Sequence, residues 1–101
     1  MRRIVFSAQA RRDMWEIWEY IAEANIPAAD RLADKIQELT RLLATMPGGG
    51  HVRLDVDDNR YRFWTVKPYV IAYRYTSRTL TVVRVLHGAR DFRQIFRKRN
   101  R

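Results

Sequence analysis

The sequence predicts an α+β fold: a short N-terminal strand and a two-helix antiparallel hairpin pack on one face of a small antiparallel sheet, followed by a short basic helix or tail. Two observations predict this class. Apolar residues recur at helical spacing over residues 8–46, and β-branched and aromatic residues dominate residues 51–88. Connections within each half are short, which favours antiparallel neighbours. The 101 residues fit one domain, spanning residues 1–101.

A short strand is expected at residues 4–6, followed by a helix over residues 8–24. Ser7 stands where an N-cap belongs, since its hydroxyl can accept a backbone N–H of the first turn. The apolar face of this helix consists of Ala10, Met14, Ile17 and Ile21. Trp18 lies on its flank, and Trp15 lies about 120° from its centre at about 100° per residue. We therefore expect the chain's own core to cover Trp15 only in part.

A second helix is expected after a break at Asn25-Ile26-Pro27, because proline is tolerated in the first helical turn. Its apolar residues alternate spacings of three and four, at Ala29, Leu32, Ile36, Leu39, Leu43 and Met46. We interpret this seam as core that packs against a neighbouring helix, rather than as an independent coiled-coil surface. Pro47 and three glycines then end the helix.

Four segments of the second half are expected as strands, at residues 51–56, 60–66, 69–76 and 80–88. The last segment, residues 89–101, is expected to form a short helix and then a flexible basic tail over residues 97–101. One side of that helix would carry Phe92, Ile95 and Phe96.

The register of the last two strands follows if Ser77-Arg78 forms a two-residue hairpin loop. Tyr73 then pairs with Val82, and the side chains directed at the helices are Val70, Ala72, Val83 and Val85. The opposite face is expected to be the open one, and it carries Tyr69, Ile71, Tyr73, Val82, Arg84 and Leu86.

The net charge of +9 lies entirely in the second half of the chain. Residues 1–50 carry seven Lys/Arg and seven Asp/Glu, whereas residues 51–101 carry thirteen and four. Seventeen of the twenty basic residues are arginine, which suits bidentate pairing with phosphate or carboxylate. We therefore expect a polyanionic partner, either nucleic acid or an acidic protein segment.

Several function classes are disfavoured by composition. The chain has no cysteine, which excludes a disulfide scaffold and thiolate chemistry. No apolar run approaches the roughly 18 residues of a membrane span, so we expect a cytoplasmic protein without a membrane partner. His51 and His87 lack the spacing of metal ligands, and the acidic residues at 55, 57 and 58 are interpreted as turn chemistry. We expect neither a metal nor a cofactor.

Two stretches of the chain resemble the RelE/ParE family of toxins from bacterial type II toxin–antitoxin systems. One is FSAQARRDMWEIWEYIAEANIPAADR at residues 6–31, and the other is RFWTVKPYVIAYRYTSRTLTVVRVLHGARDF at residues 62–92. Within the second, RVLHGARD at residues 84–91 is the most specific part. The resemblance implies two helices packed on a small antiparallel sheet. It also implies a partner antitoxin, ParD-like or similar, whose C-terminal region wraps the toxin.

The family divides by mechanism, and the RelE-like branch cuts mRNA on the ribosome with Lys, Arg and a Tyr or His. Where that branch has a Lys-x-Lys pattern, this chain has Tyr61 and Phe63. Val70 stands where the branch has an arginine, and Phe96 stands where it has a tyrosine; Arg90 matches. The resemblance is therefore closer to the ParE-like branch, whose members block DNA gyrase and leave broken DNA without being enzymes.

Two alternatives to a gyrase-poisoning toxin stay open. A ribosome-dependent mRNA interferase is supported by Arg84, His87 and Arg90. A basic nucleic-acid-binding module without toxicity is supported by the charge of the second half.

The residues expected to bind an acidic, amphipathic antitoxin segment are Trp15, Trp18, Tyr20 and Arg74. The residues expected to bind the target are Arg84, His87, Arg90, Arg93 and Arg97. Two of these have structural alternatives: His87 ends the last strand by a local hydrogen bond, and Arg90 pairs internally with Asp91. No catalytic residue is expected.

Overall fold

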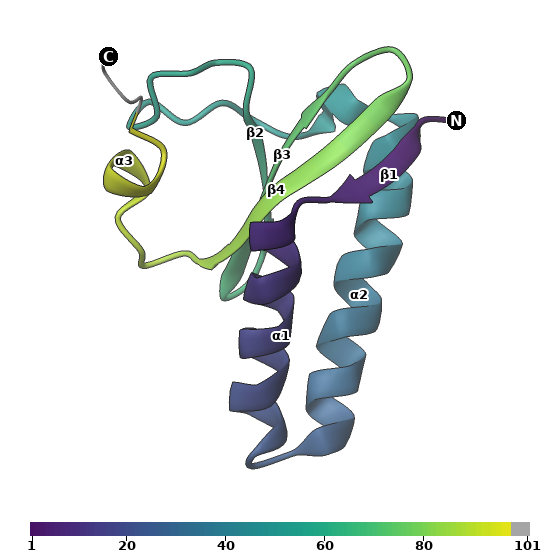
Figure 1. Cartoon of the computed structure of the whole chain (residues 1–101), viewed down its shortest axis with the longest axis vertical. Coiled ribbons are helices and arrows are strands. Elements are labelled where there is room, and N and C mark those ends of the chain that lie inside the picture. Colours follow the sequence, from purple (N-terminus) through teal and green to yellow (C-terminus); the bar gives the residue numbers. More distant parts are fainter. Residues whose placement is uncertain (98–101) are drawn as a thin grey trace.

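A four-stranded sheet with helices on both faces makes up the computed structural model, which describes residues 1–97 (Figure 1). The elements in chain order are β1 (Arg3–Phe6), α1 (Ala8–Ala22), α2 (Ile26–Thr45), the short 3-10 turn η1 (Pro47–Gly49), β2 (Arg62–Val66), β3 (Tyr69–Tyr75), β4 (Thr79–His87) and α3 (Phe92–Ile95). The expected α+β class is confirmed. Residues 98–101 of the expected tail lie outside the described residues. None of the helices in residues 1–97 has the length and apolar character needed to span a membrane.

Side-chain caps begin both long helices: Ser7 is the expected cap of α1, and Asn25, in the expected break between the helices, caps α2. The Ser7 hydroxyl accepts the Ala10 N–H at 3.0 Å and donates to the Val83 carbonyl at 2.9 Å, so it joins α1 to β4. The Asn25 side chain accepts the Ala28 N–H at 3.0 Å, with Pro27 in the first turn of α2. These caps satisfy backbone donors that have no partner within the helix.

The apolar seam of α2 packs into the core, with one exception. Ile36 and Leu43 are buried, and Leu32 and Leu39 are partly buried against the same cluster. Met46 was expected to continue the seam, but its side chain is 55% exposed. The helix ends at Thr45, and Met46 is the C-cap with φ −135° and ψ 64°, which takes its side chain out of the helical repeat.

The strand order in the sheet is β1-β4-β3-β2. The expected antiparallel meander of β2, β3 and β4 is confirmed. However, β1 pairs with β4 in parallel, with Arg3 opposite Thr79 and Phe6 opposite Val82, so the sheet is mixed. The two helices lie between β1 and the rest of the sheet in sequence, which supplies the long crossover that a parallel pair requires.

The expected strand at residues 51–56 does not form. Only His51 pairs with β2, through its N–H and carbonyl to Phe63 at 3.0 and 2.8 Å. Beyond His51, Arg53 and Asp55 bond to each other, and Asp58 accepts from Arg60. These local hydrogen bonds turn the chain away from the ladder despite its alternating pattern.

A β-bulge changes the expected register of β3 and β4. Tyr73 pairs with Val82 as expected, but the pairing then shifts, so that Ala72 lies opposite Arg84 and Ile71 opposite Val85. Val83 is therefore an additional residue on β4. The shift brings both Val82 and Val85 to the face that meets α1 and α2.

The expected orientation of β3 is inverted. The larger side chains, Tyr69, Ile71 and Tyr73, fill the space against the helices, whereas Val70 and Ala72 face the other way. That second face is not open near its centre, because Phe92 of α3 and Val56 of the loop at residues 50–61 cover it and pack with Phe63 of β2. Figure 1 shows α1 and α2 on one side of the sheet and α3 on the other.

Candidate functional site

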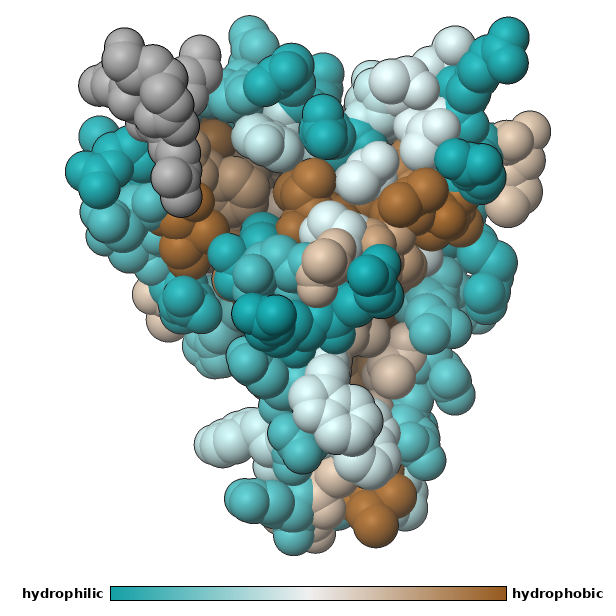
Figure 2. All heavy atoms as spheres, viewed as in Figure 1, coloured by the Kyte–Doolittle hydropathy of each residue, from teal (hydrophilic) through white to brown (hydrophobic). Residues whose placement is uncertain are grey.

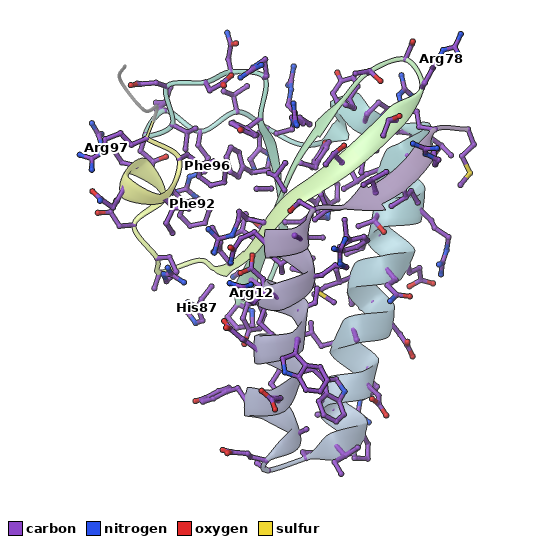
Figure 3. The ribbon with its side chains drawn as sticks, viewed as in Figure 1. Arg12, Arg78, His87, Phe92, Phe96 and Arg97 are labelled. Carbon is purple, nitrogen blue, oxygen red and sulfur yellow. The ribbon has the colours of Figure 1, made fainter. Side chains whose placement is uncertain are left out.

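Four of the five positions that correspond to RelE-like catalytic residues lie in a largely aromatic cluster that attaches α3 to the sheet. The Phe63 ring meets Phe92 edge-on at 5.9 Å and Phe96 at 5.6 Å between centroids. Tyr61 lies 5.1 Å from Phe96, and Val70 is buried in the same cluster. Figure 3 shows Phe92 and Phe96 pointing from α3 towards the sheet. These side chains pack α3 against the sheet. Of the five positions compared with the RelE-like branch, only Arg90 carries a cation.

An arginine from the neighbouring loop covers this cluster. The Arg53 guanidinium lies 3.9 Å from the centroid of Phe92 and donates to both oxygens of Asp55 at 2.9 and 2.8 Å. The hydrogen bond from Arg53 lowers the pKa of the Asp55 carboxyl, and the same bond raises the pKa of Arg53. This role was not predicted from the sequence. The Arg-x-Asp spacing was its only signal.

Arg84, expected to bind the target, pairs with a buried carboxylate. Its Nε and Nη2 donate to the two oxygens of Asp13 at 2.8 and 3.0 Å. The same Asp13 also accepts the Val85 N–H at 2.9 Å. The Arg84 side chain is 21% exposed. Most of its hydrogen-bonding capacity is therefore directed into α1 rather than outward.

His87 and Arg90 do lie together, in a groove of about 410 Å³ between α1 and the end of β4. The other side chains at this groove include Glu16 and Tyr20 from α1 and Tyr69 from β3. His87 Nδ1 accepts the Ala89 N–H at 3.0 Å, so the neutral ring carries its proton on Nε2. This is the local hydrogen bond expected if His87 ends the strand, and the ring stays exposed in the groove.

The expected pairing of Arg90 with Asp91 is not formed among residues 1–97. Asp91 instead accepts the Gln94 N–H at 3.2 Å and caps α3. Arg93 and Arg97 are exposed on and just after that helix. Arg97 points outward in Figure 3, and it borders a smaller hollow together with Arg84 and Phe96. The four exposed target-binding candidates thus lie along one end of β4 and α3.

The aromatic residues expected to bind an antitoxin are divided between two flanks of α1. Trp15 is 60% exposed, as expected, and its ring stacks on Trp18 at 6.1 Å with 19° between the planes. Trp18 Nε1 donates to Asp30 of α2 at 2.9 Å, which fixes the indole across the helical hairpin. Tyr20 lies beside His87, and it also lines a groove of about 570 Å³ together with Trp18. We call Trp15 and Trp18 the tryptophan patch.

Arg74 lies apart from the tryptophan patch. It pairs with Thr81 near the β3–β4 turn, on the face of the sheet opposite α1 and α2. Its neighbours there are Thr76, Thr79 and Arg60. The structure therefore does not bring the four expected antitoxin-binding residues into one site.

The fold has a solved relative. The chain is similar to a protein from "Chromosomal ParDE TA system from P. aeruginosa", with a TM-score of 0.70 and 18% sequence identity, over 86% of this chain and 96% of that chain. At this identity the likeness concerns the fold. No curated protein sequence matches the chain.

The sequence itself identifies the family. Residues 4–92 match the family described as "ParE toxin of type II toxin-antitoxin system, parDE". This match spans most of the chain, so the protein belongs to the ParE toxin family. The expected resemblance, closer to the ParE than to the RelE branch, is confirmed.

Proposed function

We propose that this ParE-family toxin inhibits DNA gyrase without itself being an enzyme, and that a cognate ParD-like antitoxin neutralises it. The observation that supports the absence of ribonuclease chemistry is the aromatic cluster. Phe63 is 2% exposed and packs against Phe92 and Phe96. A positioned acid or base is worth about 10²–10⁴-fold in rate, and Phe63, Val70 and Phe96 can supply neither.

The target surface that we propose follows β4 into α3. His87, Arg90, Arg93 and Arg97 are exposed there and offer hydrogen-bond donors without an ion-pair partner among the described residues. Arg84 contributes indirectly, since its pair with Asp13 holds the start of this segment against α1. The solved relative comes from a ParDE system, which supports a ParD-like partner for this chain as well.

The antitoxin surface that we propose is the tryptophan patch. Interface hot spots are enriched in tryptophan and form where a partner covers an exposed aromatic ring. Trp15 is exposed and its stacking on Trp18 holds it in place before binding. A disordered, amphipathic antitoxin segment that folds on this patch would bury both rings.

The function is tested by expressing the toxin with and without the antitoxin and measuring two products in parallel. Purified gyrase should accumulate cleaved DNA in the presence of the toxin, and the antitoxin should prevent it. A purified translation system should show no codon-specific mRNA cleavage. Cut mRNA with intact gyrase activity would instead establish the interferase alternative.

The antitoxin surface is tested separately with Trp15→Ala. Loss of an anchor should weaken the complex by about 2 kcal/mol or more, measured by calorimetry on the folded variant. Leu54→Ala removes a fully exposed apolar side chain from the loop at residues 50–61; it is the control and should change the affinity much less. Unchanged affinity for Trp15→Ala would remove the tryptophan patch from the interface.

A further inference from the structure

The face of the sheet that α3 packs on is only half covered. Near the β3–β4 turn, this face carries two cross-strand pairs. Arg74 of β3 lies opposite Thr81 of β4, and Arg3 of β1 lies opposite Thr79 of β4. Tyr73 and Val82, the next pair along, point to the helices, so the alternation of the strands directs Arg74 and Thr81 away from them. This uncovered half of the sheet carries arginine and threonine side chains together with Val5, opposite Thr81, whereas the half under α3 is apolar.

The uncovered half is hollowed. A depression of about 370 Å³ is lined by Arg60, Arg74, Tyr75, Thr76, Thr79 and Thr81. Arg60 reaches it from the loop at residues 50–61, and the other five come from the β3–β4 hairpin. Figure 2 shows the loop and the hairpin turn as separate projections at the top of the molecule. We call this depression the hairpin hollow.

The charge around the hairpin hollow is strongly positive. Arg3, Arg74 and Arg78 form no ion pair among residues 1–97, and Figure 3 shows Arg78 projecting from the hairpin turn. Arg60 pairs with Asp58 at 2.6 Å, yet its side chain remains 69% exposed. Arg2 lies on the other side of the hairpin, since its guanidinium is 5.4 Å from the Tyr75 ring and its Nη1 donates to the Ala44 carbonyl of α2 at 3.4 Å.

The donor set matches phosphate better than an acidic peptide. Arginine forks and threonine hydroxyls are the groups that commonly bond to phosphate oxygens of nucleic acids. A peptide that folds on binding needs apolar anchors as well as charge. Among the described residues that line the hairpin hollow none is aliphatic, and Tyr75 is the one aromatic.

We infer that the hairpin hollow binds the phosphodiester backbone of nucleic acid, with Arg74 as the principal contact inside it, Thr79 and Thr81 as hydroxyl donors, and Arg3 beside it on β1, opposite Thr79. This inference goes beyond the proposed function and does not require gyrase as the target. It reassigns Arg74, expected to bind the antitoxin, to a nucleic-acid contact. Recognition by phosphate alone carries no sequence information, so binding is expected to be independent of sequence.

The test is fluorescence anisotropy of labelled nucleic acid with the full-length toxin, without gyrase or antitoxin, at salt concentrations from about 50 to 200 mM. The probes are a duplex DNA of about 20 base pairs and a single-stranded RNA of similar charge. The variant Arg3→Gln/Arg74→Gln should weaken binding about tenfold and reduce the slope of log affinity against log salt by about one per arginine. The probe that responds identifies the source of the phosphates.

The matched control is Arg31→Gln/Arg41→Gln, which makes the same change in charge at exposed positions of α2, on the far side of the sheet. It should leave the affinity within about twofold of the original. Melting temperatures show whether both variants are folded. If the double variant is not, Arg74→Gln and Arg78→Gln are tested singly.

Three results would overturn the inference. The first is equal loss of affinity in the control, since the net charge alone would then explain binding. The second is a wild-type protein that binds neither probe. The third is a labelled polyglutamate peptide that binds and loses affinity in the hairpin variant while neither nucleic acid does so, which would assign the hollow to an acidic protein.

Discussion

Asp13 joins α1 to β4 at the point where the β-bulge disturbs the sheet. Its carboxylate accepts from Arg84 Nε and Nη2 and also accepts the Val85 N–H at 2.9 Å. Asp13 is only 6% exposed, so these donors replace the water that the carboxylate loses. The Asp13 carboxylate thus provides a hydrogen-bond acceptor both for the Arg84 guanidinium and for the Val85 N–H, next to the additional residue of the bulge.

Replacing Asp13 should therefore destabilise the fold strongly. Asp13→Asn removes the charge and leaves the Arg84 guanidinium partly buried without a carboxylate. We expect a loss of about 2–3 kcal/mol, the range for hydrogen bonds to charged groups, measured by urea unfolding. Glu19→Gln, at an exposed position of the same helix, should stay within about 0.5 kcal/mol. Equal effects of the two substitutions would contradict the role of the pair.

Gly50 should not tolerate a side chain, whereas Gly48 should. A Cβ on Gly50 would overlap the Tyr73 hydroxyl and lie 2.9 Å from the Phe63 carbonyl oxygen, but a Cβ on Gly48 would meet nothing within 4 Å. Gly50→Ala should cost about 1–3 kcal/mol, as overpacking does. Gly48→Ala should be neutral or stabilise by up to about 1 kcal/mol, by restricting the unfolded chain. Thermal unfolding of the two variants checks this order.

Removing the Tyr73 hydroxyl should cost stability at neutral pH. The buried hydroxyl donates to the Pro47 carbonyl at 2.6 Å and accepts the Gly50 N–H at 2.9 Å. In Tyr73→Phe both backbone groups lose this partner, at a cost of about 1–3 kcal/mol. Chemical unfolding at pH 7 measures the loss, and an unchanged unfolding free energy would show that water replaces the hydroxyl.

Stability should also fall at alkaline pH because of the same tyrosine. Burial raises the pKa of the Tyr73 phenol, and burial likewise raises the pKa of Tyr69. Since the folded pKa exceeds the unfolded value of about 10, the stabilisation is complete below pH of about 10 and is lost as the pH rises through the folded pKa. Unfolding free energies measured above this pH should decline less steeply in Tyr73→Phe than in the wild type.

Phe92 should contribute more to stability than Phe96, although both face the sheet. Phe92 is 1% exposed and lies under the Arg53 guanidinium, whereas Phe96 is partly exposed. Phe92→Ala should cost about 3–5 kcal/mol, the range for a fully buried ring, and Phe96→Ala should cost less. A larger effect of Phe96→Ala in urea unfolding would show that Tyr61 and Phe63 depend chiefly on that ring.

Local patterns predicted the helices and most strands well, because their signals act over a few residues. The Ser7 and Asn25 side chains cap a helix through backbone donors only three residues away. The exposure of Trp15 follows from its angular position on α1 alone. The strand expected at residues 51–56 failed for a similarly local reason. Strand pairing of this segment competes with the hydrogen bonds between Arg53 and Asp55. The hydropathy pattern gives no measure of the strength of those bonds.

The faces of the sheet were not predictable from alternation alone. Both sets of residues in β3 are apolar, so the choice depends on what covers each face. Tyr73 faces the helices because Pro47 and Gly50 bond to its hydroxyl there. Ala72 faces the aromatic rings of α3, where its small side chain leaves them room. These partners are distant in sequence from β3, so the residue pattern within the strand cannot predict them.

The candidate site was only partly predictable for the same reason. The charge of Arg84 was evident from sequence, but its use was not, since Asp13 precedes it by 71 residues. Likewise, Arg74 and the tryptophan patch were grouped by residue type, whereas the strand pairing places Arg74 on the opposite side of the sheet.

The parallel pairing of β1 with β4 makes completion of the sheet depend on the last strand to be synthesised. The Ser7 hydroxyl bonds to the Val83 carbonyl across 76 residues, and β1 has no other strand beside it. Contacts of such long sequence separation form slowly. While a ribosome is still making the β3–β4 hairpin, β1 lacks its neighbour and α1 lacks the surface it packs on. A chain released at that stage lacks the β1–β4 pairing, so the native sheet closes only after β4 has been made.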